Sequence, residues 1–324
     1  MNDEAATEIR IGVVGAGAIG GWIAARLALA GTAVSVLARG ATLAALRRDG
    51  LHLRQSEKAT RIAVPASDDP AELGIQDVLI VAVKAPALAD AAEAARPMIG
   101  PETVIVPMLN GVPWWFTVEP LVSVDPGGRI AAALPSERII GCVVHAACSR
   151  PEPNHIVVKH ADKLILGEID GGISDRVLRL ASLFERAQIK VEQSDNVRRA
   201  IWYKLWGNAT INPLSALTRS TADRLLAEPH VRAWMLEAMA ELAAIGAAIG
   251  CPISESGEDR MAVTAKLGAF KTSMLQDVEA GRPIELEALL GAPREIASRV
   301  GIPTPQLDRI YGLTRLVADN LGLL

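Results

Sequence analysis

The chain of 324 residues has few cysteines, no block of basic residues and no uninterrupted apolar run long enough to span a membrane. Its three cysteines (Cys142, Cys148 and Cys251) lack the spacing of a metal site and form no disulfide framework. They indicate buried thiols in a reducing compartment. A net charge of −4 without a basic cluster argues against a nucleic-acid partner.

A secretory signal is not visible either, because the first residues are acidic and the first apolar run contains glycines. We therefore expect a cytoplasmic protein without a membrane partner. Residues 11–37 form the most apolar stretch, but its glycines and Arg26 favour a βαβ unit over a membrane span. With 50% hydrophobic and 22% charged residues, the chain can build a core, and its length predicts about two domains.

A glycine-rich turn follows the first apolar strand. Gly15 permits a tight turn, Gly17 lets the backbone approach a pyrophosphate, and Gly20 lets helix and strand pack closely. The helix expected from Ala18 would point its first N–H groups, including that of Ile19, at the phosphates. A second strand follows this helix, and this context favours dinucleotide binding over an ordinary glycine-rich turn.

The end of the second predicted strand bears on the choice of cofactor. Residues 33–37 are followed by Arg39, with no acidic residue beside it. An acid at this position would bind the ribose 2′-hydroxyl of NAD, whereas a guanidinium suits a 2′-phosphate by charge and by its planar donors. The sequence therefore predicts NADP(H), with a solvated surface arginine as the alternative.

Two more apolar strands are each followed by polar residues. Lys84 comes directly after residues 77–83, and Asn110 and Gly111 come after residues 103–109. Continuous apolar strands are typical of a buried parallel sheet, and ligands bind beyond the carboxyl ends of such strands. A solvated lysine and ordinary turn chemistry explain these residues about equally well.

Residues 112–116 and 139–167 raise two further hypotheses. Three histidines (His145, His155 and His160) fall in the β-rich segment 139–167, but they lack the spacing of a metal site. We therefore expect no metal. The aromatic patch at 112–116 stands out in a chain with only 3% aromatic residues, and it could line a substrate site or simply pack a loop.

The character of the sequence changes near Asp195, where alternating strands give way to long helical patterns. We predict an α/β fold class with an N-terminal Rossmann-type, doubly wound parallel sheet and an all-helical C-terminal domain. The proposed division is an NADP-binding Rossmann-like domain at 1–195 and a helical substrate or catalytic domain at 196–324.

The first long helix, residues 197–213, carries a polar stripe. Lys204, Asn208 and Asn212 recur every four residues and so share one face. Asparagine is a poor helix former, and apolar residues occupy the other faces, which favours a ligand-facing stripe over a solvated one. An ammonium with two carboxamides suits an oxyanion or carboxylate. Pro213 should disrupt or kink this helix at its end.

Helices are expected to continue at 229–249, 255–266, 270–281, 283–300 and 304–320. Ser273 lies in the third of these, among other small polar groups. Pro283 would occupy the first turn of the fourth, with Glu285 close behind. A simple interpretation of Glu285 is a charge that complements the helix dipole.

These motifs together resemble the ketopantoate reductase (2-dehydropantoate 2-reductase) family, from Ile11 to about Leu316. They are G-A-G-A-I-G at 15–20, V-A-V-K at 81–84, L-N-G at 109–111, W-Y-K-L-W-G-N-A-T-I-N-P-L at 202–214, and T-S-M-L-Q-D at 272–277 followed by Glu285. The resemblance implies a Rossmann domain, a helical domain and an active site between them. It also implies NADPH-dependent reduction of ketopantoate to (R)-pantoate, a step towards pantothenate and coenzyme A.

The resemblance also implies roles for individual residues. Lys204 would be the general acid for the carbonyl oxygen, and Glu285 would face Lys204 and the ligand. Asn110 and Lys84 would lie near the nicotinamide and ribose, with the backbone at Ala147 close to the cofactor. Hydride arrival leaves an alkoxide that needs a proton and a positive neighbour, and a lysine supplies both.

For the substrate, the resemblance implies that Asn208, Asn212 and Ser273 hold the carboxylate and hydroxyl, with Asn110 nearby. A homodimer is a further expectation. The sequence departs from the family pattern at Ala222, at Leu290 and in the bulky Trp114-Trp115 loop. These departures keep two alternatives open: a D-2-hydroxyacid dehydrogenase or other 2-oxoacid reductase of the same fold, and a dinucleotide sensor without turnover.

Overall fold

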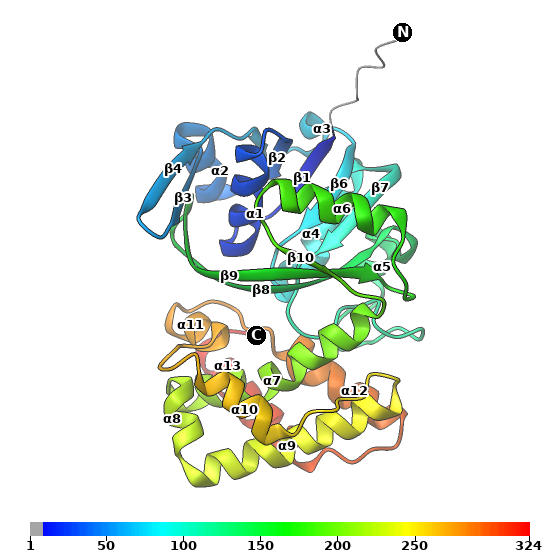
Figure 1. Cartoon of the computed structure of the whole chain (residues 1–324), viewed down its shortest axis with the longest axis vertical. Coiled ribbons are helices and arrows are strands. Elements are labelled where there is room, and N and C mark those ends of the chain that lie inside the picture. Colours follow the sequence, from blue (N-terminus) through cyan, green and yellow to red (C-terminus); the bar gives the residue numbers. More distant parts are fainter. Residues whose placement is uncertain (1–8) are drawn as a thin grey trace. The chain divides into compact units, whose positions relative to one another are not determined.

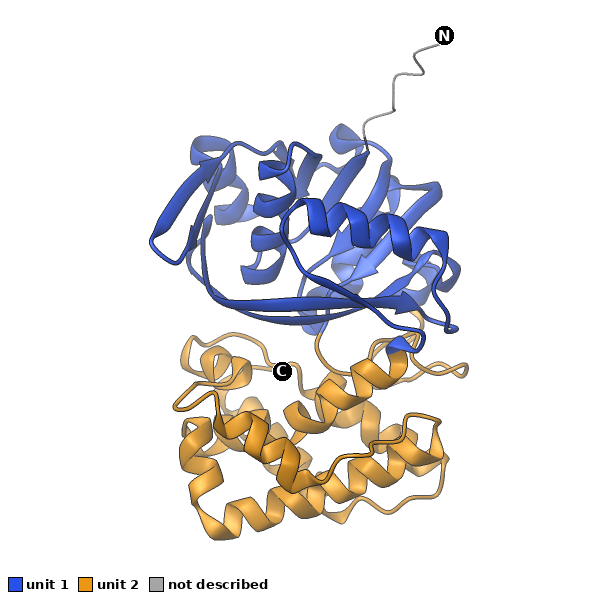
Figure 2. Cartoon of the chain, viewed as in Figure 1, with its two compact units in different colours: residues 1–109, 129–197 blue, residues 110–128, 198–324 orange. Residues whose placement is uncertain are grey.

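The computed structural model describes residues 9–324, which form two compact units (Figure 2). Unit 1 comprises the chain up to residue 109 together with residues 129–197, and unit 2 comprises residues 110–128 and 198–324. The predicted division at residue 195 therefore misplaced residues 110–128, which group with the helices. The reason is packing, since Phe116 of this segment stacks on Trp202 with the ring centroids 5.9 Å apart.

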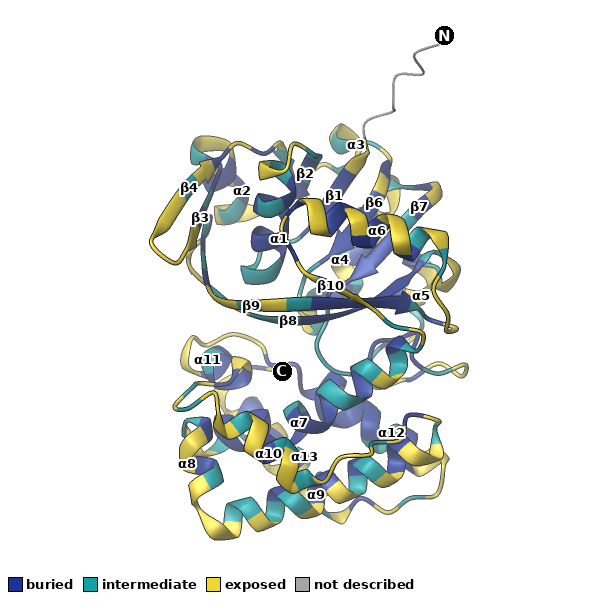
Figure 3. Ribbon diagram, in the orientation of Figure 1, coloured by how far each residue is buried: buried dark blue, intermediate teal, exposed yellow. Residues whose placement is uncertain are grey.

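The first sheet of unit 1 is entirely parallel, with strand order β5-β2-β1-β6-β7. Its strands are β1 (Arg10–Val14), β2 (Ala33–Leu37), β5 (Ala66–Ser67), β6 (Gln76–Val81) and β7 (Ile99–Pro107). β1 and β6 are buried along most of their length (Figure 3), which explains their continuous apolar sequences. Since β1 lies in the middle of the sheet, the glycines that follow it emerge at a carboxyl edge flanked by β2 and β6.

A second sheet of unit 1 contains a long antiparallel pair and three shorter strand pairings. It comprises β3 (Leu51–Gln55), β4 (Lys58–Ile62), β8 (Ile140–Glu152), β9 (His155–Glu168) and β10 (Val191–Gln193). β9 pairs antiparallel with β8 and parallel with both β3 and β10. The sequence predicted the β-rich region around 139–167, whereas the β3–β4 hairpin was not anticipated.

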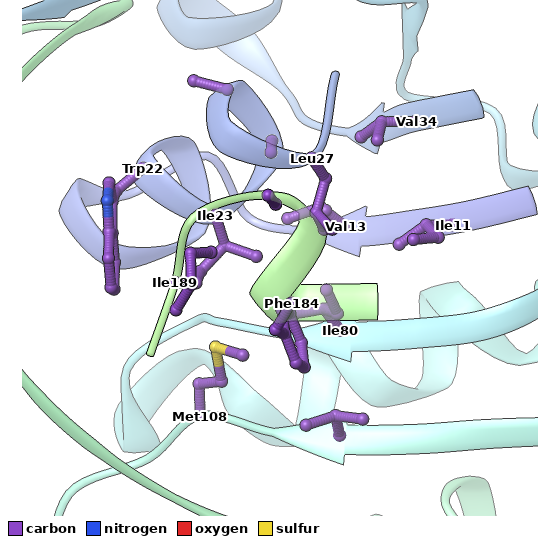
Figure 4. Packing of buried hydrophobic residues seen from close by; sticks show 14 of the residues in the cluster. Ile11, Val13, Trp22, Ile23, Leu27, Val34, Ile80, Met108, Phe184 and Ile189 are labelled. Carbon is purple, nitrogen blue, oxygen red and sulfur yellow. The ribbon is translucent and has the colours of Figure 1, made fainter. Parts of the chain in front are cut away.

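The helix α1 (Ala18–Leu29) packs against strands of both sheets. Its residues Trp22, Ile23 and Leu27 are at most 2% exposed, and they lie in one core with Val13 and Phe184 (Figure 4). Because α1 is apolar on nearly all sides, as expected of a helix covered on both faces, the glycine loop before it is firmly held.

The other helices of unit 1 are no longer than α1. They are α2 (Gly40–Asp49), α3 (Pro70–Leu73), α4 (Leu88–Ala95), α5 (Arg129–Ala133) and α6 (Asp175–Arg186), with the 3₁₀ turns η1 (Ala85–Ala87), η2 (Arg96–Met98) and η3 (Ser136–Arg138). The side chain of Ser174 accepts a hydrogen bond from the N–H of Val177 and so caps α6. The parallel sheet with its helices confirms the predicted Rossmann-type α/β class.

Unit 2 is helical throughout its described elements (Figure 1). These are α7 (Val197–Thr218), α8 (Ala222–Ala227), α9 (Pro229–Ala248), α10 (Gly257–Ala265), α11 (Ser273–Glu279), η4 (Glu287–Gly291), α12 (Ala292–Arg299) and α13 (Pro305–Leu321); the first residue of α7, Val197, belongs to unit 1. Among residues 9–324, no helix is both long and apolar enough to cross a bilayer.

Two predicted helix boundaries are wrong. α7 continues five residues past Pro213 to Thr218, because buried packing of residues such as Leu214 holds the helix beyond the proline. The helix expected from Pro283 begins only at Leu286, so Glu285 lies in the segment before the helix. That segment is fixed by a hydrogen bond from the N–H of Ile284 to the carbonyl of Leu323, 3.0 Å long.

Candidate active site

The glycine loop of unit 1 has the geometry that a pyrophosphate needs. Gly15 has a φ of +91°, and a Cβ there would lie 2.6 Å from the side chain of Val83. A Cβ on Gly20 would lie 2.0 Å from the carbonyl oxygen of Gly15. At Gly17, by contrast, an added Cβ would meet only the carbonyl of Ala82 at 3.8 Å, so the space above this residue is open. Two glycines thus shape the loop, and the third leaves room for a ligand.

The start of α1 completes this candidate phosphate site. Gly17 is the N-cap residue and provides no side chain, and the first turn contains no acidic residue. The N–H groups of Ala18 and Ile19 therefore begin the helix without a side-chain cap. A helix N-terminus in this state favours an anion through both its free donors and its dipole. The residues present fit the pyrophosphate of a dinucleotide.

The other predicted cofactor residues of unit 1 lie at strand ends or on a strand. Arg39 is exposed, is the N-cap residue of α2, and its guanidinium has no hydrogen bond or ion pair to another residue within 9–324. Lys84 follows β6 and precedes η1. Ala147 is exposed on β8 opposite His160 of β9. An exposed, unpaired guanidinium at the end of β2 is available to a phosphate.

In unit 2, three residues far apart in the sequence form one polar cluster. The Nζ of Lys204 donates to Oδ1 of Asn110 over 2.9 Å, and Nδ2 of Asn110 donates to a carboxylate oxygen of Glu285 over 3.3 Å. An ammonium can only donate and a carboxylate only accept, so this arrangement defines the orientation of the amide. Asn110 therefore connects the ammonium of Lys204 to the carboxylate of Glu285.

The residues of this cluster are partly or fully buried, which strengthens the effect of the ammonium charge on a bound group. Glu285 is only 7% exposed, while Lys204 and Asn110 are part-buried. Buried charges are kept only where they are paired and hydrogen-bonded. An ammonium held in this way can stabilise a developing alkoxide and donate a proton to it. The structure thus brings Asn110 into contact with both Lys204 and Glu285, the two residues that the family resemblance implied to face each other.

Three further predicted residues offer polar groups in unit 2. Asn208 and Asn212 follow Lys204 along one face of α7, and Ser273 is the first residue of α11. Their side chains make no hydrogen bond to another described residue. Asn212 is nevertheless only 5% exposed. Free carboxamides on the same face as the lysine are suitable for a substrate carboxylate.

The aromatic segment after Asn110 is packed inside unit 2. Trp114, Trp115 and Phe116 are 4%, 5% and 3% exposed. The carboxylate of Glu295, in α12, accepts hydrogen bonds from the N–H groups of Val122 and Ser123 further along this segment. Burial acts to raise the pKa of Glu295, but hydrogen bonds from the side chain and N–H of Ser123, the N–H of Val122 and the side chain of Arg299 together hold this pKa below its usual range. Phe116 stacks on Trp202, so this aromatic residue packs the loop against α7.

The remaining departures from the family pattern are also buried. Ala222 and Leu290 are both 0% exposed. Neither supplies a polar group, so both positions serve packing in this chain.

His145, His155 and His160 belong to the second sheet of unit 1. The rings of His52 and His155 stack with centroids 4.4 Å apart, on paired strands. In the described part of the chain, no group of three or more His, Cys, Asp or Glu residues could hold a metal ion. Burial raises the pKa of the Cys148 thiol to about 12, which leaves it a poor nucleophile.

Sequence reasoning missed the link from Asn110 to Glu285, because these residues are 175 positions apart and no local pattern connects them. It also missed the π-helical turn η4, which follows Glu285. Pro293, two residues after the end of this turn, is a signal that could have indicated an irregular helix.

The fold and the glycine loop define a protein of the dinucleotide-binding class. Family models described as ketopantoate reductase PanE/ApbA and ketopantoate reductase PanE/ApbA C terminal match residues 11–171 and 196–318. The 2-dehydropantoate 2-reductase of Mesorhizobium japonicum is 39% identical over 97% of this chain and 99% of that protein. The chain belongs to the ketopantoate reductase family, as its motifs predicted.

Solved structures agree with this assignment. A candidate ketopantoate reductase from Ralstonia solanacearum MolK2 is 52% identical, with a TM-score of 0.95 over 98% of this chain and 100% of that one. A D-mandelate dehydrogenase solved with NADH and anilino(oxo)acetate has a TM-score of 0.86 over 98% of this chain and 100% of that one. At 19% identity this second likeness shows the fold alone.

Proposed function

We propose that the protein reduces the ketone of 2-dehydropantoate to (R)-pantoate with NADPH. The observation that carries this proposal is the buried cluster of Lys204, Asn110 and Glu285 in a chain of the ketopantoate reductase family. A 2-oxo acid is the substrate class of the family's named reaction, and the cluster supplies the acid that such a reduction needs.

The chemistry follows from the placement of charge. The glycine loop would hold a reduced nicotinamide dinucleotide, and this cofactor would supply the hydride that the carbonyl carbon accepts, which would leave negative charge on the carbonyl oxygen. Lys204 stabilises the resulting alkoxide by its positive charge and gives it a proton, which forms the alcohol. Asn110 holds the ammonium in place from one side, since its Oδ1 lies 2.9 Å from Nζ. Glu285 orients Asn110, and solvent returns the lost proton to the amine.

The substrate carboxylate would be held by the free amides of Asn208 and Asn212 and by the hydroxyl of Ser273. Their lack of hydrogen bonds to other described residues supports this role. On the cofactor side, Gly15, Gly17 and Gly20 would shape the pyrophosphate site. Lys84 and the backbone of Ala147 would contact the nicotinamide and ribose.

For the cofactor, we infer NADP(H) over NAD(H) because Arg39 is exposed and has no partner within the described chain. Arg39→Ala should raise the dissociation constant for NADPH at least tenfold and leave that for NADH nearly unchanged. Arg48→Ala is the matched control, because Arg48 lies at the other end of α2 and pairs with Asp49. Equal losses for both cofactors would refute the phosphate role.

The decisive experiment is steady-state oxidation of NADPH and NADH with 2-dehydropantoate and a panel of other 2-oxo acids. We expect fast turnover with 2-dehydropantoate and NADPH. Activity with another 2-oxo acid alone would reassign the substrate to that acid and keep the mechanism. Cofactor binding without turnover across the panel would contradict the proposal and favour a sensor.

Lys204→Met tests the proton donor. It should lower kcat by about 10²- to 10⁴-fold, which is the usual contribution of a general acid. Lys266→Met is the control, since Lys266 is exposed and has no hydrogen bond or ion pair to another described residue. Turnover by Lys204→Met at the wild-type rate would refute Lys204 as the proton donor.

Formation of a homodimer stays a prediction, which light scattering of the purified protein would test.

A further inference from the structure

The loop that carries Asn110 is attached to the π-helical turn that follows Glu285. The N–H of Val112 donates to the carbonyl oxygen of Ala288 over 2.8 Å. Gly111, with a φ of +80°, lies so close to this turn that an added Cβ would be 2.3 Å from the same oxygen. Ala288 is 4% exposed, so its carbonyl needs a partner inside the protein.

That carbonyl is available because of the local helix geometry. In a regular α-helix, the oxygen of Ala288 would accept from the N–H of Ala292. In this turn Ala292 instead donates to Glu287, one residue earlier. The next residue is Pro293, which has no N–H to donate. Neither register of the helix therefore supplies a donor to Ala288.

We infer that Pro293 is a positioning residue for the proposed reaction. Its missing N–H leaves the Ala288 carbonyl to Val112, and this bond holds Asn110 two residues away. The same turn begins two residues after Glu285, whose carboxylate accepts from Asn110 over 3.3 Å. One irregular turn thus sets both ends of the Asn110–Glu285 contact. π-helical turns are frequent at functional sites.

This inference rests on the proposed function for its catalytic consequence, but its structural half can be tested without turnover. Pro293→Ala supplies a new N–H that can compete with Val112 for the Ala288 carbonyl. We expect amide hydrogen exchange at Val112 to become at least tenfold faster. The free energy of unfolding should stay the same or rise, because alanine is a better helix former than proline.

The kinetic effect should fall on kcat. A displacement of about 1 Å in a catalytic group costs on the order of 10²-fold, so we expect kcat to fall roughly 10- to 100-fold with little change in KM. Pro305→Ala is the matched control, because Pro305 starts α13 in a helix first turn where no N–H is required. Pro305→Ala should change neither the exchange rate at Val112 nor kcat.

The exchange rate at Val112 and kcat together decide whether Pro293 positions Asn110. Faster exchange at Val112 together with lower kcat in a stable protein supports the inference. Unchanged exchange at Val112, or faster exchange with wild-type kcat, overturns it. A lower free energy of unfolding with unchanged kcat would assign Pro293 a purely structural role. If the wild-type protein reduces no 2-oxo acid, the proposed function fails, while the exchange measurement still decides whether Pro293 controls the contact.

Discussion

Replacing Asn110 by Asp separates the role of this residue in stability from its role in catalysis. The new carboxylate keeps an oxygen near Lys204, 2.9 Å away in the wild-type protein, and puts an oxygen where Nδ2 lay 3.3 Å from Glu285. With an effective dielectric constant of about 20, attraction to the ammonium is about 6 kcal/mol and repulsion from the carboxylate about 5 kcal/mol. These terms nearly cancel in the resting protein.

The balance changes when Lys204 gives up its proton. The attraction of about 6 kcal/mol then disappears while the repulsion between the two carboxylates remains, so proton transfer costs about 6 kcal/mol more than in the wild-type protein. Since each 1.36 kcal/mol is tenfold in rate, kcat should fall by up to about 10³- to 10⁴-fold. Asn110→Ala instead removes both hydrogen bonds, each worth about 1.5–3 kcal/mol to charged partners, without adding a charge.

The two variants should therefore rank in opposite orders. Asn110→Asp should be the more stable protein in urea unfolding and the slower enzyme in NADPH oxidation. Asn110→Ala should be less stable and faster. If Asn110→Asp is the faster enzyme, the proton does not come from Lys204 within this cluster. If it is also the less stable protein, the charge balance calculated from the two distances is wrong.

Three other predictions concern packing, pH and the cofactor. Phe116→Ala should lower the free energy of unfolding by about 3–5 kcal/mol, whereas Val118→Ala, at a site 94% exposed, should have almost no effect in the same urea titration. Hydrogen bonds from Arg176 hold the pKa of Glu168 in the folded protein below its usual range. This pair therefore stabilises the protein fully at pH values above the pKa that Glu168 has in the unfolded chain, and the stabilisation is lost as the pH falls through the pKa of the folded protein. Arg176→Gln should accordingly cost more stability at pH 7 than near pH 3.5, which urea unfolding at both pH values would show; an equal cost would contradict this linkage. Gly17→Ala should leave stability unchanged, because its Cβ would meet only one atom at 3.8 Å, yet weaken cofactor binding at least tenfold in a fluorescence titration; full affinity would exclude close approach of the pyrophosphate.

The sequence predicted the first half of the fold well because the signals there are local. Gly15 needs a positive φ, Gly20 lacks room for a Cβ, and the continuous apolar strands β1 and β6 can be read without knowing their partners. The same is true of the stripe of Lys204, Asn208 and Asn212, which depends only on helical periodicity. Local rules were sufficient for these elements.

Features that depend on distant partners could not be predicted. Residues 110–128 follow a strand of unit 1 in sequence, but Phe116 packs on Trp202, which no periodicity reveals. The carbonyl of Ala288 in the π-helical turn accepts from Val112, which belongs to a loop far earlier in the sequence. A proline in α7 was expected to disrupt the helix, yet tertiary packing carried the helix five residues beyond it.

The discontinuity of unit 2 has a consequence for the order of synthesis. Residues 110–128 leave the ribosome before any of the helices on which they pack, and translation at about 5–20 residues per second makes them wait several seconds for α7. During that time Trp114, Trp115 and Phe116 have no completed core to enter. A nascent chain of this protein therefore displays an aromatic segment that chaperones could bind, and a fragment starting at residue 198 would lack both this segment and Asn110.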